Sequence, residues 1–240
     1  MPKHLFFDLD NTLTPSRSRM NPAHIPLFAQ LCAKMDVTVV SGSSEVVIHE
    51  DIPGAAGGYY VLAQSGNHAE DKAGKILWHE TFSAEQKKST LDFIHEIRTT
   101  LSLPVTNEND LIEDRGSQIS YSLIGHNEDR AKKKEFDPGA VKRLGILADR
   151  AAARAKLKAE GIEVMPGGTT CLDFYLAGKN KGFNITRLII QEGWDKSECL
   201  YIGDALFPGG NDEAVIGVIP TLAVADPQET FDYISATFLS

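Results

Sequence analysis

Two aspartates, Asp8 and Asp10, follow a short apolar run near the start of the chain, in the stretch FFDLDNTLT. Side chains two positions apart on an extended segment point the same way, so both carboxylates can face one pocket. Two neighbouring carboxylates repel each other unless a cation lies between them or one of them takes up a proton. The pair therefore predicts a cation site or a proton-transfer site.

Polar groups also stand beside other predicted elements further along the chain. Ser41 follows the run VTVV, Asp204 follows CLYIG, and Lys181 stands just before a helical pattern in GKNKG. In open parallel sheets, ligands bind beyond the carboxyl ends of the strands, where the strand order reverses. We therefore expect these side chains to converge with the two aspartates.

The chemistry predicted for this pocket is phosphoryl transfer to an aspartate. Asp204, with or without Asp212, would bring the number of carboxylates to three or four, and an oxygen-rich cluster of this kind suits Mg²⁺. Ser41 offers a hydroxyl and neighbouring backbone N–H groups to a phosphate oxygen, and Lys181 offers a positive charge. Carboxylate, metal, hydroxyl and ammonium are the groups that phosphoryl transfer requires.

Each of these motifs has an ordinary explanation when it is taken alone. A D-x-D sequence is often a turn or a helix cap, SGSS is often a plain loop, and PGGND could be a tight turn. A single lysine such as Lys181 is most often a surface residue. The order and spacing of all four motifs are much harder to obtain by chance than any one of them.

The elements around these motifs predict an α/β fold with an insertion. Apolar runs alternate with helical patterns in residues 1–81 and again in 179–240, which is typical of a parallel sheet covered by helices. Residues 82–178 instead follow an α-β-β-α-β-β pattern, which predicts an α+β domain inserted into the first one.

Local signals place the helices of this insertion. Ser83 and Gln86 have the spacing of a capping box, and the helix that follows would have Leu91, Ile94, Ile97 and Leu101 on one face. A long Ala-rich helix would begin at Asp137 and Pro138 and end at Gly161. The charged run EDRAKKKEFD between them is typical of a solvated loop or a helix end.

Composition narrows the class of partner. The net charge of −9 argues against nucleic acid and anionic membranes as partners, so an anionic substrate would need a metal or a local basic pocket. The three cysteines form no CxxC pair, which fits a reducing cytoplasm. We expect no signal peptide, because Asp8 interrupts the first apolar run, and no apolar stretch reaches the length of a membrane span.

The motifs FFDLDNTLT, VVSGSS, GKNKG and YIGDALFPGGND, in this order, resemble motifs I to IV of the haloacid dehalogenase (HAD) superfamily. An insertion between motifs II and III resembles the C2-type cap of subclass IIB. Further stretches, QSGNHAE, EDRGSQISYSLIGH and GGTTCLDFYLAGKNKG, are similar to the α-phosphomannomutase family of this superfamily, and the similarity covers nearly the whole chain. The resemblance implies a Rossmann-like HAD core, formed by 1–81 and 179–240, and a cap at 82–178 that selects the substrate.

The resemblance also implies a role for individual residues. Asp8 would be the nucleophile that becomes phosphoaspartate, and Asp10 the general acid and base. A homodimer formed through the cap would also be consistent with the family. The remaining implied roles are phosphoryl binding by Ser41 and Lys181; Mg²⁺ binding by Asp8, the main-chain carbonyl of Asp10 and Asp204, supported by Asn211 and Asp212; and binding of a small phosphosugar by Arg17, Gly42, Arg115, His126 and Asp173.

The chain departs from the phosphomannomutase pattern in the predicted cap. His126 stands where that family has arginine, Lys133 or Arg130 would have to replace a second arginine, and Cys171 stands where the family has serine. A weaker grip on a second phosphate favours a sugar-phosphate phosphatase, with a phosphomannomutase as the alternative. A non-catalytic phospho-ligand binder is disfavoured, because it would have no use for a nucleophile paired with an acid. In motif I, Asn11 replaces the usual glycine.

Overall fold

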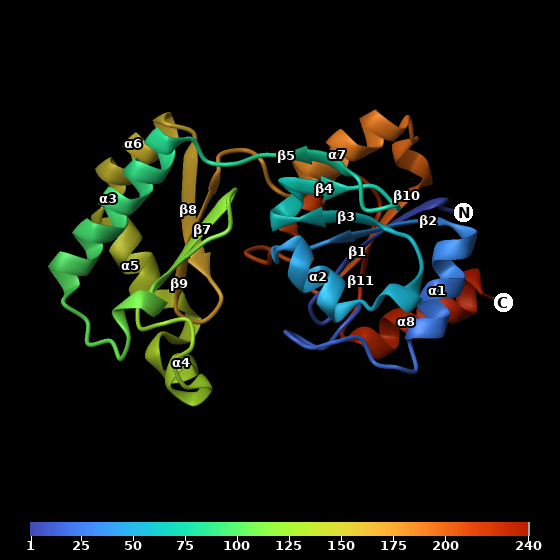
Figure 1. The fold of residues 1–240 in the computed structure, drawn as a ribbon, viewed down its shortest axis with the longest axis horizontal. Helices are drawn as coiled ribbons and strands as arrows, with labels where there is room; N and C mark the ends of the chain where they lie inside the picture. Colours follow the sequence, from blue (N-terminus) through green and yellow to red (C-terminus); the bar gives the residue numbers. More distant parts are fainter. Residues whose placement is uncertain (240) are drawn as a thin grey trace. The chain divides into compact units, whose positions relative to one another are not determined.

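The structure is a computed structural model that describes residues 1–239, with the side chain of Ala55 also left out of the description. The chain divides into two compact units, which we call the core unit, residues 1–79 and from 179 onward, and the inserted unit, residues 80–178. Each unit has a sheet of its own (Figure 1). Within residues 1–239, no helix has the length and apolar character needed to cross a membrane.

The core unit is built on a seven-stranded sheet with the strand order β11-β10-β1-β2-β3-β4-β5. The five strands from β11 to β3 are parallel to their neighbours, and β4 and β5 are added antiparallel. This arrangement confirms the predicted α/β class. The helices and strands are β1 (His4–Asp8), α1 (Ile25–Lys34), β2 (Asp36–Val40), α2 (Glu45–Asp51), β3 (Tyr60–Ala63), β4 (His68–Glu70), β5 (Ile76–His79), α7 (Lys181–Glu192), β10 (Cys199–Gly203), β11 (Thr221–Ala223) and α8 (Pro227–Phe238).

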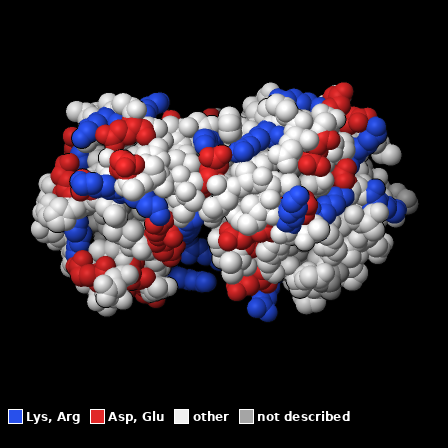
Figure 2. Space-filling model, turned by 45° about the horizontal axis from the view of Figure 1, so that its top comes forward, with Lys and Arg blue, Asp and Glu red and all other residues white. Residues whose placement is uncertain are grey.

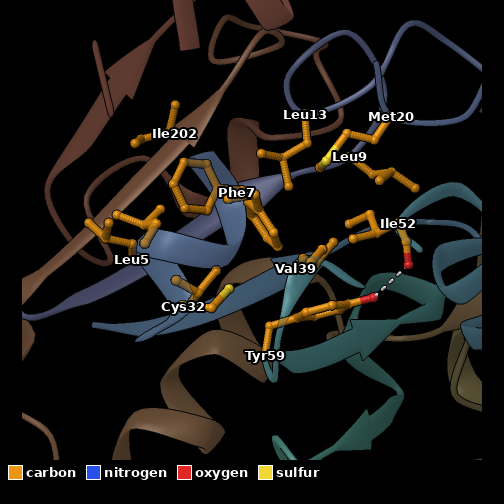
Figure 3. Packing of buried hydrophobic residues seen from close by; sticks show 14 of the residues in the cluster. Leu5, Phe7, Leu9, Leu13, Met20, Cys32, Val39, Ile52, Tyr59 and Ile202 are labelled. Atoms are coloured by element: carbon orange, nitrogen blue, oxygen red, sulfur yellow. Dashed lines mark hydrogen bonds between the residues drawn. The ribbon is translucent and has the colours of Figure 1, made fainter. Parts of the chain in front are cut away.

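Strand β1 is buried along its whole length because helices cover both faces of the sheet. Leu5 and Phe7 point into a cluster that contains residues of α1 and α8, and Figure 3 shows both side chains within it. Phe6 points the other way, into a second cluster that contains residues of α7. Alternation along the strand therefore places Asp8, two residues after Phe6, on the α7 side of the sheet.

The inserted unit has a four-stranded antiparallel sheet with the order β6-β7-β9-β8, and helices α3, α5 and α6 cover one face of it (Figure 1). A sheet separate from the core sheet is what the sequence pattern predicts. The helices and strands are α3 (Ala84–Leu101), β6 (Ile112–Asp114), β7 (Gln118–Ser122), α4 (Arg130–Phe136), α5 (Val141–Asp149), α6 (Ala151–Ala159), β8 (Ile162–Gly167) and β9 (Cys171–Leu176).

The capping box that begins α3 is confirmed, since Ser83 Oγ accepts from Gln86 N at 3.2 Å and Gln86 Oε1 accepts from Ser83 N at 3.0 Å. The predicted helix face is wrong in part. Leu91 is 45 % exposed, and the buried stripe is instead formed by Thr90, Phe93, Ile94 and Ile97. Burial of Phe93, the largest apolar side chain of this helix, rotates the stripe by one residue.

The predicted single helix from Asp137 to Gly161 is also wrong, because the segment forms two helices that are separated at Arg150. Asp137 still acts as a cap, but one turn later than expected. Its carboxylate accepts hydrogen bonds from Lys142 N at 2.7 Å and from Arg143 N at 3.2 Å. The charged run before it contains helix α4, whose N-cap is Asp129.

Acidic and basic side chains are mixed on the visible surface of both units in Figure 2. Several of the surface charges form pairs within one unit, such as Lys72 with Asp36 in the core unit and Lys87 with Asp114 in the inserted unit. Exposed pairs of this kind contribute little to stability.

Candidate active site

Asp8 lies at the carboxyl end of the central strand β1 and is only 2 % exposed. Its Oδ1 atom accepts a hydrogen bond from Lys181 Nζ at 2.6 Å. Its Oδ2 atom is buried and has no hydrogen-bond partner among the described residues. Because a buried carboxylate oxygen is costly to leave unpaired, this atom fits a place where a cation or an electrophile would bind.

Lys181 is the first residue of α7, rather than a residue just before the helix as predicted, and Asn180 caps that helix. The Lys181 side chain is 3 % exposed and contacts three oxygen atoms, Asp8 Oδ1 at 2.6 Å, Asp212 Oδ1 at 2.7 Å and Tyr201 Oη at 3.4 Å. The next residue, Gly182, allows this end of the helix to lie close to the backbone at Ala214, since a Cβ atom at position 182 would lie 2.0 Å from the Ala214 carbonyl oxygen.

Tyr201 belongs to this cluster, although sequence reasoning missed it. Its hydroxyl donates to Asp212 Oδ1 at 2.6 Å, and the residue is fully buried. Tyr201 lies on β10 directly beside Phe6 of β1, and therefore on the α7 side of the sheet. Tyr201 stands within the strand pattern CLYIGD, where an aromatic residue is normally a core residue, so the sequence did not point to it.

Three carboxylates of this cluster can approach one ion. Asp8, Asp204 and Asp212 each have an oxygen atom within 4.8 Å of the others. Asp204 is half-buried, and one of its oxygens accepts a hydrogen bond from Asn11 Nδ2 at 3.3 Å. The set contains oxygen donors alone, which is the set that Mg²⁺ prefers. Together with the unpaired Asp8 Oδ2 atom, these donors fit a magnesium ion.

The charges of the cluster are not balanced by Lys181 alone. Burial is the main cause that raises the pKa of Asp8 from 3.8 to about 7; Lys181 opposes this shift, and Asp212 adds to it. Burial would lower the pKa of Lys181, but the charges of Asp8 and Asp212 raise it above 10.5, so the ammonium stays protonated. Burial also raises the pKa of Asp204. A divalent cation would favour the ionised form of all three carboxylates.

The other predicted site residues of the core unit lie on loops that follow β1 and β2, apart from Asn211, which follows β10. Asp10 is half-buried, and its Oδ1 atom accepts a hydrogen bond from the backbone N–H of Arg17 at 2.6 Å. Arg17 is exposed and has a positive φ of 54°. Ser41 is buried, and its Oγ atom accepts from Ser43 N at 3.0 Å. Of the remaining two predicted site residues in this unit, Gly42 is half-buried and Asn211 is exposed.

Comparison with known proteins gives the family. The model of the haloacid dehalogenase-like hydrolases matches residues 5–214. The chain belongs to this family. It is 26 % identical over 254 residues to a phosphomannomutase of Solanum lycopersicum, with 97 % of this chain and 93 % of the relative covered. It is 25 % identical to human phosphomannomutase 1, with 93 % and 87 % covered.

A solved structure of a haloacid dehalogenase-like hydrolase from Bacteroides thetaiotaomicron has the same fold. The TM-score is 0.69 at 13 % identity, and the match covers 99 % of this chain and 100 % of the other. The resemblance to the haloacid dehalogenase superfamily is thus confirmed, and so is the prediction of an enzyme of that family.

In the inserted unit, the predicted site residues of this hydrolase lie around the sheet face opposite the helices. Ile119 of β7 packs among the helices, whereas Ser120 points the other way and is paired in register with Asp173 of β9. Asp173 Oδ1 accepts a hydrogen bond from Ser120 Oγ at 2.5 Å, and Asp173 Oδ2 accepts one from Tyr175 Oη at 3.2 Å. Arg115, in the turn between β6 and β7, pairs with Glu113 at 2.5 Å.

His126 lies beside this sheet face and contacts three groups. Its Nε2 atom is 3.2 Å from the carbonyl oxygen of Ser120, and its Nδ1 atom is 3.9 Å from Cys171 Sγ and 3.6 Å from Glu113 Oε1. The buried Lys133 donates to the carbonyl oxygen of His126 at 2.7 Å, so its ammonium fixes the loop that contains His126. Arg130, the first residue of α4, is exposed.

We expect His126 to titrate above pH 6.5. Burial alone would lower its pKa, but the hydrogen bond to Cys171 and the nearby charges of Cys171 and Glu113 raise the pKa above 6.5. The stability that this shift contributes is therefore fully present below pH 6.5 and is lost as the pH rises through the folded-state pKa. NMR titration of the imidazole carbon resonances would measure the pKa of His126.

The matched variant for this titration is Cys171→Ala, which removes the thiol and should bring the pKa of His126 down relative to the parent protein. A His126 that titrates at or below 6.5 in the parent would contradict the contacts described here.

Proposed function

We propose that this hydrolase is a Mg²⁺-dependent phosphotransferase that acts on a small phosphosugar through a phosphoaspartate at Asp8, and that it is a sugar-phosphate phosphatase. The observation that carries the proposal is the pairing of Lys181 with both Asp8 and Asp212, with Asp8 Oδ2 left unpaired beside Asp204. A buried ammonium that holds one oxygen of the Asp8 carboxylate and leaves the carboxylate a free oxygen suits a nucleophile.

In the first half-reaction, the Asp8 carboxylate attacks the phosphorus atom and the bond between phosphorus and the sugar oxygen breaks. Asp10 donates a proton to the departing oxygen, which requires it to be protonated at that moment. Lys181 donates to Asp8 Oδ1 and compensates the charge of the carboxylate, while Ser41 donates to a phosphoryl oxygen. Mg²⁺, held by Asp8, Asp204 and the carbonyl of Asp10 with Asp212 and Asn211 in support, would neutralise charge on the phosphate.

In the second half-reaction, water attacks the phosphorus atom of phospho-Asp8 and Asp10 takes its proton. The products are inorganic phosphate and the regenerated carboxylate. A mutase shares the first step, but it must keep water out and return the phosphoryl group to a second sugar hydroxyl.

Two features of the inserted unit support hydrolysis over mutase activity. The side chain at position 126 is an imidazole in contact with Cys171 and Glu113, and Lys133 is bound to a backbone carbonyl, so neither offers the forked guanidinium that grips a second phosphate. Arg17, Arg115 and Asp173 support a phosphorylated hexose as the substrate, since arginine binds phosphate and carboxylates accept from sugar hydroxyls.

The alternative is a phosphomannomutase that interconverts mannose 1-phosphate and mannose 6-phosphate. It is supported by relatives that carry this name and match nearly the whole chain at 26 % and 25 % identity. A homodimer through the inserted unit stays a prediction. The cytoplasm remains the proposed location, because all three cysteines are free.

The deciding assay supplies mannose 1-phosphate, Mg²⁺ and a catalytic amount of a hexose bisphosphate, and follows both free phosphate and mannose 6-phosphate. We expect free phosphate and mannose as the main products, at a rate that does not depend on the bisphosphate. Accumulation of mannose 6-phosphate, dependent on the bisphosphate, would overturn the phosphatase proposal in favour of the mutase.

A further inference from the structure

We propose that Tyr201 is a positioning residue, which fixes Asp212 and Lys181 so that one oxygen of Asp212 is directed to the cation and one ammonium proton to Asp8. This inference rests on the proposed function, because it assigns a task to a residue that contacts the groups of the same site. The predicted site does not include Tyr201, and no role is assigned to it above, although motif IV begins at this residue.

The hydrogen bonds form a closed ring. Tyr201 donates to Asp212 Oδ1 at 2.6 Å, Lys181 donates to the same oxygen at 2.7 Å, and Lys181 also lies within 3.4 Å of the Tyr201 hydroxyl. A lysine ammonium has three protons, and the third points at Asp8 Oδ1 at 2.6 Å. All three protons of Lys181 therefore have a hydrogen-bond acceptor only while the Tyr201 hydroxyl is present.

The ring also distinguishes the two oxygens of Asp212. Oδ1 accepts from both Tyr201 and Lys181, whereas the hydrogen-bond partner of Oδ2 is the N–H of Ala205 at the longer distance of 3.4 Å. The Asp212 side chain is fully buried, and Gly203 leaves room for it, because a Cβ atom there would lie 2.3 Å from Oδ2. Oδ2 is thus the oxygen of Asp212 with capacity left for a cation.

The position of Tyr201 makes its hydroxyl a fixed donor. The ring lies in the apolar cluster below α7, where it packs with Phe6, and the residue is fully buried. Burial raises its pKa well above 10.0, and the charges of Asp8 and Asp212 raise it further, so the hydroxyl keeps its proton. Phenylalanine would fill nearly the same space without this proton. The contribution of Tyr201 to the site is therefore its hydrogen-bond donor and not its packing.

The test compares Tyr201→Phe with Tyr59→Phe, a control that removes another buried tyrosine hydroxyl of the core unit. The Tyr59 hydroxyl donates to the carbonyl oxygen of Ile52 at 3.4 Å, and Figure 3 marks this hydrogen bond. Titration of the metal-free protein with MgCl₂ in a calorimeter gives the Mg²⁺ affinity without turnover. We expect Tyr201→Phe to bind Mg²⁺ about tenfold more weakly, the loss expected for a hydrogen bond to a charged group.

Kinetics at saturating Mg²⁺ provide the second measurement. We expect kcat of Tyr201→Phe to fall about tenfold while KM stays within about twofold, because Tyr201 is fully buried and presents no surface to a substrate. Tyr59→Phe should leave both constants and the Mg²⁺ affinity unchanged. Equal Mg²⁺ affinity and equal kcat in Tyr201→Phe and the parent would overturn the inference.

A double-mutant cycle shows whether Tyr201 acts through Asp212. In an Asp212→Asn background, Tyr201→Phe should change the Mg²⁺ affinity by less than about twofold, since the carboxylate it positions is gone. If the effects of the two substitutions on Mg²⁺ affinity were additive, Tyr201 would not act through Asp212. The cycle can still be measured if Tyr201→Phe is less stable than the parent. If the parent protein bound Mg²⁺ but hydrolysed no phosphate ester, the proposed function would fail while the titration still decided the role of Tyr201.

Discussion

Replacing Asp8 by asparagine is expected to reduce turnover of any phosphate ester by about 10³-fold or more, as removal of a nucleophile does in other enzymes. The amide cannot form an acyl phosphate, although it fills the same space and can still contact Lys181. Release of phosphate from p-nitrophenyl phosphate with Mg²⁺ would measure the loss, because a generic ester avoids dependence on the natural sugar.

The matched control is Asp232→Asn, a change of the same chemistry on the exposed face of α8 in the core unit. The Asp232 carboxylate accepts a hydrogen bond from Gln228 Nε2 at 2.9 Å and lies on the surface, so we expect activity equal to that of the parent protein. Activity of Asp8→Asn within a few-fold of the parent would rule out the nucleophile proposed here.

Replacing Arg143 by leucine is expected to destabilise the inserted unit by about 3–5 kcal/mol, the usual cost of breaking a buried ion pair from one side. Arg143 Nε donates to Asp137 Oδ2 at 2.7 Å, and the two side chains are 3 % and 1 % exposed. Its Nη1 atom lies within 3.1 Å of the carbonyl oxygens of Gly167, Gly168 and Cys171. The variant would leave the Asp137 carboxylate and the turn between β8 and β9 without these donors.

The effect should also depend on pH. Burial alone would raise the pKa of Asp137, but hydrogen bonds from Arg143 and from the Lys142 N–H lower this pKa below 3.8. A carboxylate with a lowered folded-state pKa stabilises the protein above the unfolded-state pKa, and this contribution is lost as the pH falls through the folded-state value. The parent should therefore lose stability below pH 3.8 more steeply than Arg143→Leu does.

Hydrogen exchange of the β7 and β9 amides is the appropriate measurement, because both tryptophans, Trp78 and Trp194, lie in the core unit and would not report unfolding of the inserted unit. Arg154→Leu on α6 is the control, since Arg154 is exposed and its guanidinium donates to the carbonyl oxygen of Leu147 at the long distance of 3.5 Å. A loss below about 1 kcal/mol in Arg143→Leu, similar to the control, would contradict the prediction.

Sequence reasoning located the charged part of the core site because charge at the end of a buried strand is rarely accidental. Asp8, Lys181 and Asp204 each stand where an apolar pattern begins or ends, and the structure brings Asp8 and Lys181 into contact and Asp204 beside them. Tyr201 gave no such signal, because an aromatic residue within a strand pattern is normally a core residue. Only the parallel register that sets it beside Phe6 reveals its hydroxyl as part of the cluster.

The fold was predictable where periodicity is strong and less so where contacts between distant residues decide. The parallel strands and the capping box at Ser83 follow from local pattern. The break between α5 and α6 does not, because every residue near Arg150 is compatible with a continuous helix. The short strands β4 and β5 were missed because they extend the sheet through antiparallel pairing with β3, a partner that local sequence does not specify.

Detection of a phosphorylated Asp8 tests the central claim most directly. The protein would be mixed with Mg²⁺ and a phosphosugar, quenched in acid during turnover, and treated with borohydride, which reduces an acyl phosphate of aspartate to homoserine. Trypsin then releases residues 4–17, a peptide that contains both Asp8 and Asp10, and fragmentation in a mass spectrometer locates the change. We expect homoserine at position 8 with Asp10 unmodified; homoserine at position 10, or an unmodified peptide during active turnover, would contradict the account.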